Sequence, residues 1–301
     1  MKKLLNINQI IFSVLLKDVN EDISIDGLNF CNRKTERKSV LSFATSIDYW
    51  EIIKNNASIS AVIVKPSDLL AYQHKEFGRK ITFITDDSPE WAFYDIHDYV
   101  ADNTDLYNVY DFPKKIGNNC SIHSSAIIED GVIIEADVMI GSHTTVRRGS
   151  VISKGAIIGN NTTISAEGFQ IIRKENISRH IRHYGGVFVG ENVYIGNNTC
   201  ICRSLFEGST YIGNNAKIDH LVNIPHNAYI GCNAVITTGV ILCGSSIVKD
   251  NAWIGKNSTI LNGVVIGEGA LVGIGSVVIR DVPSGATVAG NPARILEKNT
   301  P

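Results

Sequence analysis

Two residues eighteen positions apart, His226 and Gly244, are the main candidates in this chain for accepting a proton and donating a hydrogen bond. An imidazole, with an ordinary pKa of about 6.5, accepts a proton at neutral pH, and a glycine leaves its backbone N–H open as a donor. His220 lies one six-residue repeat before His226 and competes with it as the proton acceptor. The plain alternatives are a solvated histidine and a glycine needed for turn geometry. His123 and His143 lack the sequence that surrounds His226, so we expect them at the surface.

An aliphatic residue returns every sixth position through most of the second half of the chain and decides where these two residues lie. The hexads run from Ile116 to Ile164, from Val189 to Ile201 and from Ile212 to Val278, twenty-four in all. No α-helix brings every sixth residue to one face, because six steps of about 100° leave the side chain far from its starting direction. Short strands joined by corners do so, which is typical of a hexapeptide β-helix.

Three hexads form one coil of such a helix, so the twenty-four hexads predict eight coils. Each branched side chain then stacks on its counterpart one coil away, about 4.8 Å along the axis. Small or polar residues fill the corners, where Gly and Asn tolerate positive φ. The eighteen-residue offset places Gly244 one coil beyond His226, on the same edge. The handedness of the coils does not follow from these residues.

The composition limits the classes of function. A net charge of −2 argues against a nucleic-acid-binding or anionic-membrane surface. The apolar N-terminal stretch is interrupted by Asn6, Asn8 and Gln9, which favours an amphipathic helix over a signal peptide. No run approaches the roughly 20 apolar residues that a membrane span needs. We therefore expect a soluble, cytoplasmic protein.

The period divides the chain into parts. We predict an α/β domain over residues 1–112, a β-helix over 113–280 with a loop at 165–188, and a capping tail over 281–301. In the first domain we predict helices near 8–16, 48–55 and 89–100, and strands near 40–43, 60–64 and 80–84. The expected fold class is mainly β.

The segment 165–188 breaks the six-residue period and is rich in basic and aromatic residues. It carries Phe169 together with Arg173, Arg179 and Arg182. A β-helix can expel a loop at a corner without disturbing its ladder, and long ordered loops are usually functional. We predict a substrate loop in which an arginine meets phosphate, although no spacing singles one out. A flexible insert is the alternative.

Several motifs resemble known hexapeptide acyltransferases. KIDHLVNIPHNAYIG resembles the coil around the catalytic histidine of the UDP-3-O-acylglucosamine N-acyltransferases, the lipid A family. LSFATSIDY and SAVIVKP resemble that family's nucleotide-binding domain, and ISAEGF and VFVGENVYIG also align with it. The tail VPSGATVAGNPARIL resembles the terminal signature of enzymes that use acyl-coenzyme A. N-acyltransferases of nucleotide-linked 4-amino sugars share the histidine coil and the tail.

The resemblance implies a left-handed β-helix, a homotrimer with three interfacial active sites, and roles for individual residues. His226 would be the general base, and the N–H of Gly244 would stabilise the oxyanion. Phe43 and Tyr49 would stack on a pyrimidine, with Ser46 at the family's asparagine between them. Both rings could instead be ordinary core aromatics.

The resemblance also implies a groove between neighbouring prisms for acyl-coenzyme A, which would be a co-substrate and not a permanent cofactor. The expected contacts in this groove are Gly273, Gly275, Gly290, Asn291 and Pro292. Arg294 would meet a phosphate of the coenzyme, or be solvated. No metal site is expected.

Four departures separate the chain from the lipid A family. The sequence stops at Pro301, directly after the coenzyme-A-type tail, where lipid A enzymes continue into helices that meet acyl carrier protein. Gly263 stands where that family has a second functional histidine, and Cys202-Arg203-Ser204 replaces its Asp-Arg-Gly element. Ser46 replaces the asparagine and leaves room for a thymine methyl group.

We therefore predict an acyl-coenzyme-A-dependent N-acyltransferase acting on a dTDP- or UDP-linked amino sugar, for polysaccharide biosynthesis. The same-class alternative is a lipid A N-acyltransferase that uses 3-hydroxyacyl carrier protein. A catalytically silent, nucleotide-sugar-binding β-helix is the alternative from another class. A metal enzyme resembling the γ-carbonic anhydrases would need several converging histidines, and His220 and His226 alone do not make that pattern.

Overall fold

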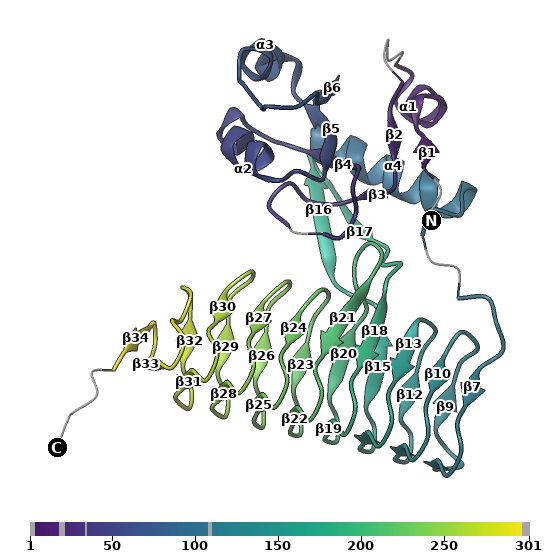
Figure 1. Cartoon of the computed structure of the whole chain (residues 1–301), viewed down its shortest axis with the longest axis vertical. Coiled ribbons are helices and arrows are strands. Elements are labelled where there is room, and N and C mark those ends of the chain that lie inside the picture. The colour runs from purple at the N-terminus through teal and green to yellow at the C-terminus, as the bar shows by residue number, and fades with distance from the viewer. Residues whose placement is uncertain (1–3, 18–21, 34, 108–109, 297–301) are drawn as a thin grey trace. The chain divides into compact units, whose positions relative to one another are not determined.

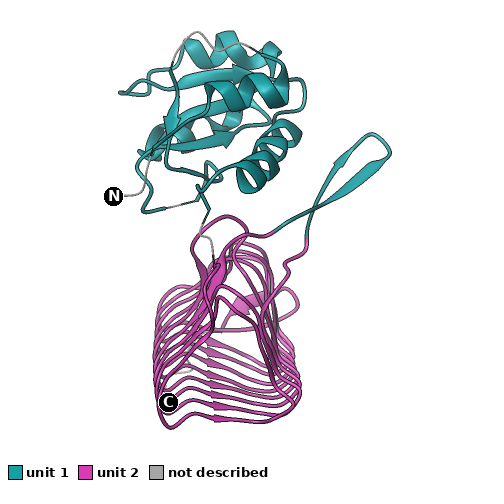
Figure 2. Cartoon of the chain, turned by 90° about the vertical axis from the view of Figure 1, so that its right-hand side faces the viewer, with its two compact units in different colours: residues 1–109, 170–182 teal, residues 110–169, 183–301 magenta. Residues whose placement is uncertain are grey.

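The computed structural model describes residues 4–17, 22–33, 35–107 and 110–296. The chain divides into two compact units (Figure 2). The first unit comprises residues 1–109 and 170–182, and the second comprises 110–169 and 183–301. The first unit therefore takes a piece of chain from the middle of the β-helix sequence.

The first unit is built on a four-stranded parallel sheet in the order β3-β4-β5-β6. Helix α4 packs against β4 and β5, and α1 packs on α4. A short antiparallel pair, β1 and β2, stands apart from this sheet. The strands are β1 Leu5–Asn6, β2 Ser24–Ile25, β3 Gly27–Leu28, β4 Val40–Phe43, β5 Ile59–Val64 and β6 Thr82–Thr85. The helices are α1 Asn8–Leu15, η1 Ile47–Tyr49, α2 Trp50–Asn55, η2 Pro66–Asp68, α3 Leu69–Gln73 and α4 Pro89–Asn103.

Hydrophobic patterning predicts most of this unit, and the differences lie in short elements. The predicted helix at 48–55 begins as the 3₁₀ turn η1 and continues as α2. Helix α3 is not predicted, because five residues hold too little periodic signal to separate it from a loop. Alternate strand residues pack on opposite faces, so Phe43 contacts Phe93 of α4 while Val40 joins the cluster around Ile53 and Tyr72.

The second unit is a parallel β-helix with three sheets that run along its length (Figure 1). Two sheets have eight strands and one has ten, which confirms eight coils. The first sheet contains β7 Lys115–Ile116, β10 Ile133–Ile134, β13 Ser150–Ile152, β18 Gly186–Val189, β21 Ser209–Ile212, β24 Tyr229–Ile230, β27 Ile247–Val248 and β30 Val265–Ile266. The second contains β8 Ser121–Ile122, β11 Met139–Ile140, β14 Ile157–Ile158, β19 Tyr194–Ile195, β22 Lys217–Ile218, β25 Val235–Ile236, β28 Trp253–Ile254, β31 Leu271–Val272, β33 Thr287–Gly290 and β34 Ala293–Ile295. The third contains β9 Ile127–Ile128, β12 Thr145–Val146, β15 Thr163–Ala166, β20 Cys200–Cys202, β23 Asn223–Ile224, β26 Ile241–Leu242, β29 Thr259–Ile260 and β32 Val277–Val278.

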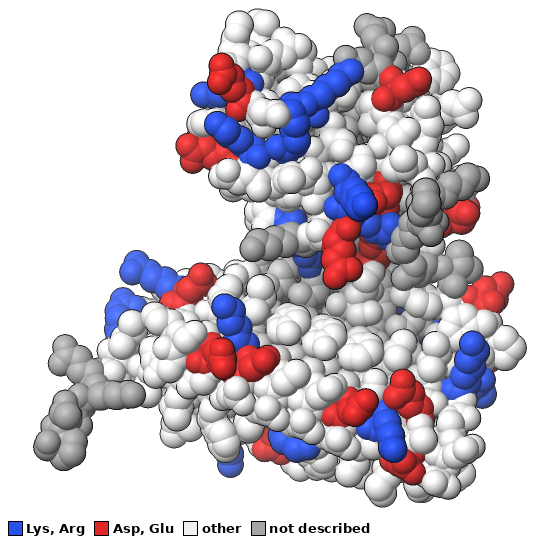
Figure 3. Space-filling model, in the orientation of Figure 1, with Lys and Arg blue, Asp and Glu red and all other residues white. Residues whose placement is uncertain are grey.

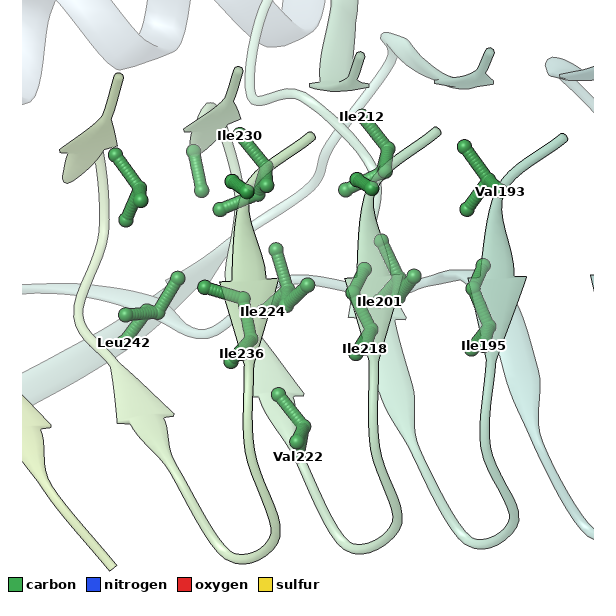
Figure 4. Packing of buried hydrophobic residues seen from close by; sticks show 14 of the residues in the cluster. Val193, Ile195, Ile201, Ile212, Ile218, Val222, Ile224, Ile230, Ile236 and Leu242 are labelled. Carbon is green, nitrogen blue, oxygen red and sulfur yellow. The ribbon is translucent and has the colours of Figure 1, made fainter. Parts of the chain in front are cut away.

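The hexad side chains form the core of this unit. Ile218 pairs with Ile236, and Ile236 pairs with Ile254, so each rung repeats the one before it. These side chains point inward and stack along the axis (Figure 4). Ile116, in the first coil, keeps 47% of its surface exposed because no earlier coil covers it. Each buried aliphatic side chain contributes about 1.5–3 kcal/mol relative to its exposed state.

One hairpin departs from the predicted division, which assigned the whole loop 165–188 to the β-helix. Strands β16 Gln170–Lys174 and β17 Ile177–Ile181 form an antiparallel pair that belongs to the first unit. The guanidinium of Arg179 pairs with Asp95 and Asp98 of α4, and Arg182 pairs with Asp98 and Asp102. These ion pairs hold the hairpin to α4, and the spacing of the arginines alone does not indicate their partners.

The predicted tail 281–301 continues the β-helix. Strand β33 pairs in parallel with β31, and β34 folds back antiparallel on β33. Residues 297–301 of the predicted tail lie outside the described residues. The left-handed twist and the homotrimer stay predictions.

Charged side chains of both signs are interspersed over the face drawn in Figure 3, in keeping with the net charge of −2. Among the described residues, no helix combines the length and apolar character that crossing a bilayer would require.

Candidate active site

The corners between the third sheet and the first sheet follow one edge of the β-helix. We call this the histidine edge and define it as residues 203–208, 225–228, 243–246 and 261–264. His226 lies in the corner between β23 and β24, and Gly244 lies in the next corner, between β26 and β27. The backbone N–H of Ser245 donates to the carbonyl of His226 at 3.1 Å, which ties the two corners together. The predicted neighbourhood of His226 and Gly244 is therefore present.

Asn227 orients the ring of His226. The Oδ1 of Asn227 lies 3.0 Å from Nδ1 of His226 and accepts the backbone N–H of Leu205 at 3.1 Å. The Nδ2 of Asn227 donates to Oγ of Ser204, which fixes the amide with its oxygen towards the histidine. A carbonyl oxygen only accepts, so Nδ1 of His226 carries the proton in this contact. In the neutral ring, Nε2 is then left as the proton acceptor.

Gly244 lies directly against this acceptor. A Cβ atom added at Gly244 would sit 2.9 Å from Nε2 of His226 and 3.0 Å from Oδ1 of Asn262. The φ of Gly244 is not positive, and Ser245 takes the left-handed conformation of this corner with φ of 59°. Turn geometry therefore does not require glycine here, whereas the close approach to His226 does. No atom in the described part of the chain accepts the N–H of Gly244.

Glu167 and His183 join the site, although the sequence singled out neither as a site residue. The ring centroids of His183 and His226 are 5.0 Å apart, with the ring planes at 63°. Oε1 of Glu167 lies 3.3 Å from Nδ1 of His183 and accepts its backbone N–H at 2.7 Å. Burial acts to raise the pKa of Glu167, but hydrogen bonds from the side chain and backbone of His183 bring it below its ordinary value. The sequence signal that could have identified them is their position: Glu167 and His183 lie at opposite ends of the inserted segment, and the two ends meet at one corner.

Arg203 lies in the preceding corner and is 8% exposed. Its Nε and Nη2 donate to the carbonyl of Ser165, each at 3.2 Å. Burial lowers the pKa of the guanidinium, and the charge of Glu167 opposes that shift. Arg203 thus closes the base of the inserted segment, while its neighbour Ser204 contacts Asn227. The Cys202-Arg203-Ser204 element therefore supports His226 through the contact of Ser204 with Asn227.

His220, the competing candidate, belongs to a different edge and has a structural role there. Its Nδ1 accepts the backbone N–H of Asn197 at 2.8 Å. In earlier coils, Oδ1 of Asn197 accepts from the N–H of Asn160, and Oδ1 of Asn160 accepts from the N–H of Ser142. His220 therefore continues a ladder of corner hydrogen bonds that asparagine begins. This contact occupies the nitrogen lone pair at Nδ1.

The residues predicted to contact coenzyme A gather at the end of the β-helix. Gly273 donates its N–H to the carbonyl of Val288, and a Cβ there would lie 2.8 Å from that of Ala289. Gly290 ends β33 with φ of 100°, and the Asn291–Pro292 bond is cis. Gly275 has φ of 64°, and the Arg294 guanidinium donates to the carbonyl of Ala293. Coenzyme A contact stays a prediction for the set Gly273, Gly275, Gly290, Asn291, Pro292 and Arg294.

The predicted nucleotide residues in the first unit are half-buried and belong to different clusters. The ring of Phe43 lies 5.0 Å from that of Phe93 and 6.4 Å from that of Tyr94. Tyr49 packs against the cluster of Val40, Ile53 and Tyr72 on the other face of the sheet. The carbonyl of Ser46 accepts a hydrogen bond from the hydroxyl of Tyr72. Stacking of a base between Phe43 and Tyr49 stays a prediction.

A cleft of about 170 Å³ opens near these residues at the carboxyl ends of β4, β5 and β6. It is lined by Thr45 after β4, Lys65 after β5, and Trp91 at the start of α4. Arg173 and Lys174 of the hairpin line it too, whereas Arg179 and Arg182 are held by α4. In open parallel sheets this edge is where ligands bind. Of the three predicted phosphate arginines, Arg173 is the one placed at a cleft.

Two further positions from the sequence lie at the start of the inserted segment and on the histidine edge. Phe169 is 81% exposed at the start of the inserted segment, and a role in a substrate loop stays a prediction for it, Arg179 and Arg182. Gly263 has φ of 72° with open space around it, in the corner after Gly244. In the described part of the chain, no three His, Cys, Asp or Glu side chains gather as a metal site would require.

Comparison with known proteins first defines the class of the second unit. Residues 113–148 match the family model described as bacterial transferase hexapeptide (six repeats). Residues 131–166 and 247–280 match the model described as hexapeptide repeat of succinyl-transferase. Together with the three parallel sheets, these matches establish a hexapeptide-repeat β-helix.

Within that class, the chain resembles proteins named UDP-3-O-acylglucosamine N-acyltransferase. One from Maricaulis maris is 45% identical over 136 residues, which are 45% of this chain and 39% of that relative. One from Caulobacter sp. strain K31 is 37% identical over 114 residues, 38% of this chain and 33% of the relative. The chain thus matches between a third and two fifths of the length of these relatives. The crystal structure of a UDP-N-acetylglucosamine acyltransferase from Bacteroides fragilis superposes with a TM-score of 0.54 at 23% identity, covering 61% of this chain and 69% of that one, and shares the fold.

Proposed function

We propose that this chain is an N-acyltransferase that moves an acyl group from a thioester donor to the amine of a UDP-linked glucosamine derivative. The observation that carries the proposal is the pairing of a fixed proton acceptor with an open N–H: Nε2 of His226 lies against Gly244. The similarity to proteins named UDP-3-O-acylglucosamine N-acyltransferase supports it.

The reaction needs what this pair supplies. The amine nitrogen attacks the carbonyl carbon of the thioester, and His226 takes the proton from that nitrogen as the C–N bond forms. The N–H of Gly244 donates to the oxyanion of the tetrahedral intermediate, a contribution of about 3 kcal/mol in comparable sites. Collapse breaks the C–S bond, and the imidazolium returns the proton to the leaving thiolate. The products are an amide and a free thiol.

The names of the relatives favour the lipid A type of substrate over a dTDP-linked sugar. That family pairs its sugar with an acyl carrier protein, whereas the tail around Gly290 and Pro292 resembles the coenzyme A signature. Both donors are thioesters and serve the same chemical step. The geometry of His226 therefore does not distinguish the two donors, and an experiment must decide between them.

The first unit is proposed to hold the nucleotide. Lys65, Arg173 and Lys174 bring positive charge to the cleft at the carboxyl edge of the sheet, which Asp87 and Glu90 also line, and Trp91 adds an aromatic wall. A diphosphate carries negative charge and a base has a flat face, so the two kinds of side chain complement a nucleotide.

The test is a matrix that combines each candidate acyl donor with each candidate amino sugar. Purified protein is incubated with UDP-3-amino, UDP-2-amino and dTDP-4-amino sugars, each with acyl-coenzyme A and with acyl carrier protein of several chain lengths, and amide products are measured by mass spectrometry. We expect amide formation with a UDP-linked amino sugar, abolished in His226→Asn. Tight binding of the nucleotide sugar without turnover under any donor would overturn the enzyme proposal and favour the silent binding protein.

A further inference from the structure

The ring of His226 has a second imidazole beside it that the proposed reaction does not use. The side chain of His183 is fully buried, and its ring meets that of His226 edge-to-face at 5.0 Å. Contacts of this kind between rings favour one relative orientation over others. His183 therefore bears on how the ring of His226 lies.

Glu167 fixes His183 in turn. One carboxylate oxygen of Glu167 accepts the backbone N–H of His183 and lies within 3.3 Å of its Nδ1. Gly168 leaves the space that the ring fills, because a Cβ there would stand 2.3 Å from Nε2 of His183. Hydrogen bonds from His183 outweigh the effect of burial and lower the pKa of Glu167, so the carboxylate is ionised at neutral pH. Ring, carboxylate and glycine form one built arrangement.

We propose that Glu167 and His183 are a positioning pair that holds the imidazole of His226 with Nε2 against Gly244. Asn227 holds the same ring at Nδ1, and the edge-to-face contact with His183 further restricts how the ring can turn about that hydrogen bond. Misplacement of a reacting group by about 1 Å can cost 10²-fold in rate. The proposal rests on the proposed function for its kinetic consequence and on geometry alone for the orientation.

Three variants test separately the ring of His183, its nitrogens and the charge of Glu167. His183→Asn keeps a donor for Glu167 where Nδ1 was and removes the ring. His183→Phe keeps a ring beside His226 and removes both nitrogens. Glu167→Gln keeps an acceptor for the backbone N–H of His183 and removes the charge. His220→Asn is the matched control, because asparagine already occupies the equivalent ladder position at residues 160 and 197.

The kinetic test measures kcat and KM separately. In His183→Asn we expect kcat to fall about tenfold or more, while KM for both substrates stays within about twofold, because the proposed pair acts through the ring of His226. His183→Phe should recover most of the lost kcat. Equal kcat in wild type and His183→Asn, at equal folded fraction, would overturn the proposal.

A second measurement is independent of any substrate. Diethyl pyrocarbonate modifies unprotonated imidazole nitrogens, and peptide mass mapping gives the rate at each histidine. Exposed His123 and His143 serve as internal references. We expect His226 in His183→Asn to react several-fold faster relative to these references, since its ring is released, and the His220→Asn control to match wild type.

Unchanged reactivity of His226 in every His183 and Glu167 variant would contradict the positioning pair, even where the variants lose thermal stability. If the wild type acylates no sugar but releasing His183 changes the reactivity of His226, the proposed function fails and the positioning pair stands. The two failures are thus distinguishable.

Discussion

At the scale of single residues, the site depends on which nitrogen of His226 accepts a proton. Asn227 accepts from Nδ1, so the acceptor nitrogen faces Gly244. The proximity of His226 and Gly244 is predictable from the eighteen-residue offset, whereas their catalytic roles are implied by the family resemblance and stay predictions. The tautomer is not predictable, because it depends on Ser204 and Leu205, which reach Asn227 from the preceding corner.

Gly244 gives the first prediction. In Gly244→Ala, a methyl group 2.9 Å from Nε2 of His226 would displace the ring, so kcat should fall by about 10²-fold while the oligomeric mass and melting temperature change little. Steady-state kinetics and thermal melts measure both. Gly213→Ala is the control, because its Cβ would meet backbone at 2.7 Å in the corner between β21 and β22, on a different edge from His226. It should lose stability and keep kcat per folded molecule. Full activity in Gly244→Ala would refute the close-contact role.

At the scale of elements, the repeat explains why His220 and His226 differ although they occupy equivalent hexad positions. One lies on the edge between the second and third sheets, and the other lies on the histidine edge. Six residues turn the chain by one corner, so equivalent positions in successive hexads face different sides. Eighteen residues return it to the same side.

The corner ladder gives the second prediction. His220→Asn should keep the stability of the wild type, because Oδ1 of asparagine accepts the equivalent N–H in earlier coils. His220→Ala leaves the N–H of Asn197 without this acceptor and should lower the free energy of unfolding by about 1 kcal/mol. Urea titration measures both. A large loss of kcat in His220→Asn, with His226→Asn still active, would reverse the assignment of the base.

The hairpin gives the third prediction, on pH. Hydrogen bonds from Arg182 lower the pKa of Asp102, against a smaller opposing effect of burial. A lowered pKa means that the stabilisation is present above the ordinary carboxyl value of about 3.9 and is lost as pH falls through the folded value. Hydrogen exchange over residues 170–181 should therefore accelerate in acid, after correction for the intrinsic pH effect. Arg182→Gln should show the faster exchange already at neutral pH. Exchange independent of pH and of Arg182 would show that this pair does not hold the hairpin.

The sequence predicted the elements of the β-helix almost completely, because one aliphatic residue per hexad specifies both the strand and its inward face. Glu167 and His183 escaped prediction for a physical reason. They meet only because β15 and β18 close the inserted segment at one corner, and no period links their positions in sequence. The ion pairs of Arg179 and Arg182 with α4 escaped in the same way.

At the scale of the whole molecule, the homotrimer is the fourth prediction. The resemblance of the sequence implies that each prism supplies one wall of an acyl-donor groove, and closed cyclic symmetry suits such a prism. Light scattering in solution should give about three times the 32.8 kDa of one chain. His226→Asn should give the same mass. A monomeric mass at micromolar concentration would contradict the trimer and the shared groove.

The central claim is that His226 is the proton acceptor for amide formation, and one measurement addresses it most directly. With the best donor and UDP-linked amino sugar from the matrix, kcat is compared for wild type and His226→Asn, with the melting temperature and oligomeric mass of each. We expect kcat of the variant to fall by about 10²-fold or more, with melting temperature and oligomeric mass unchanged. Comparable turnover by the folded His226→Asn variant would contradict it.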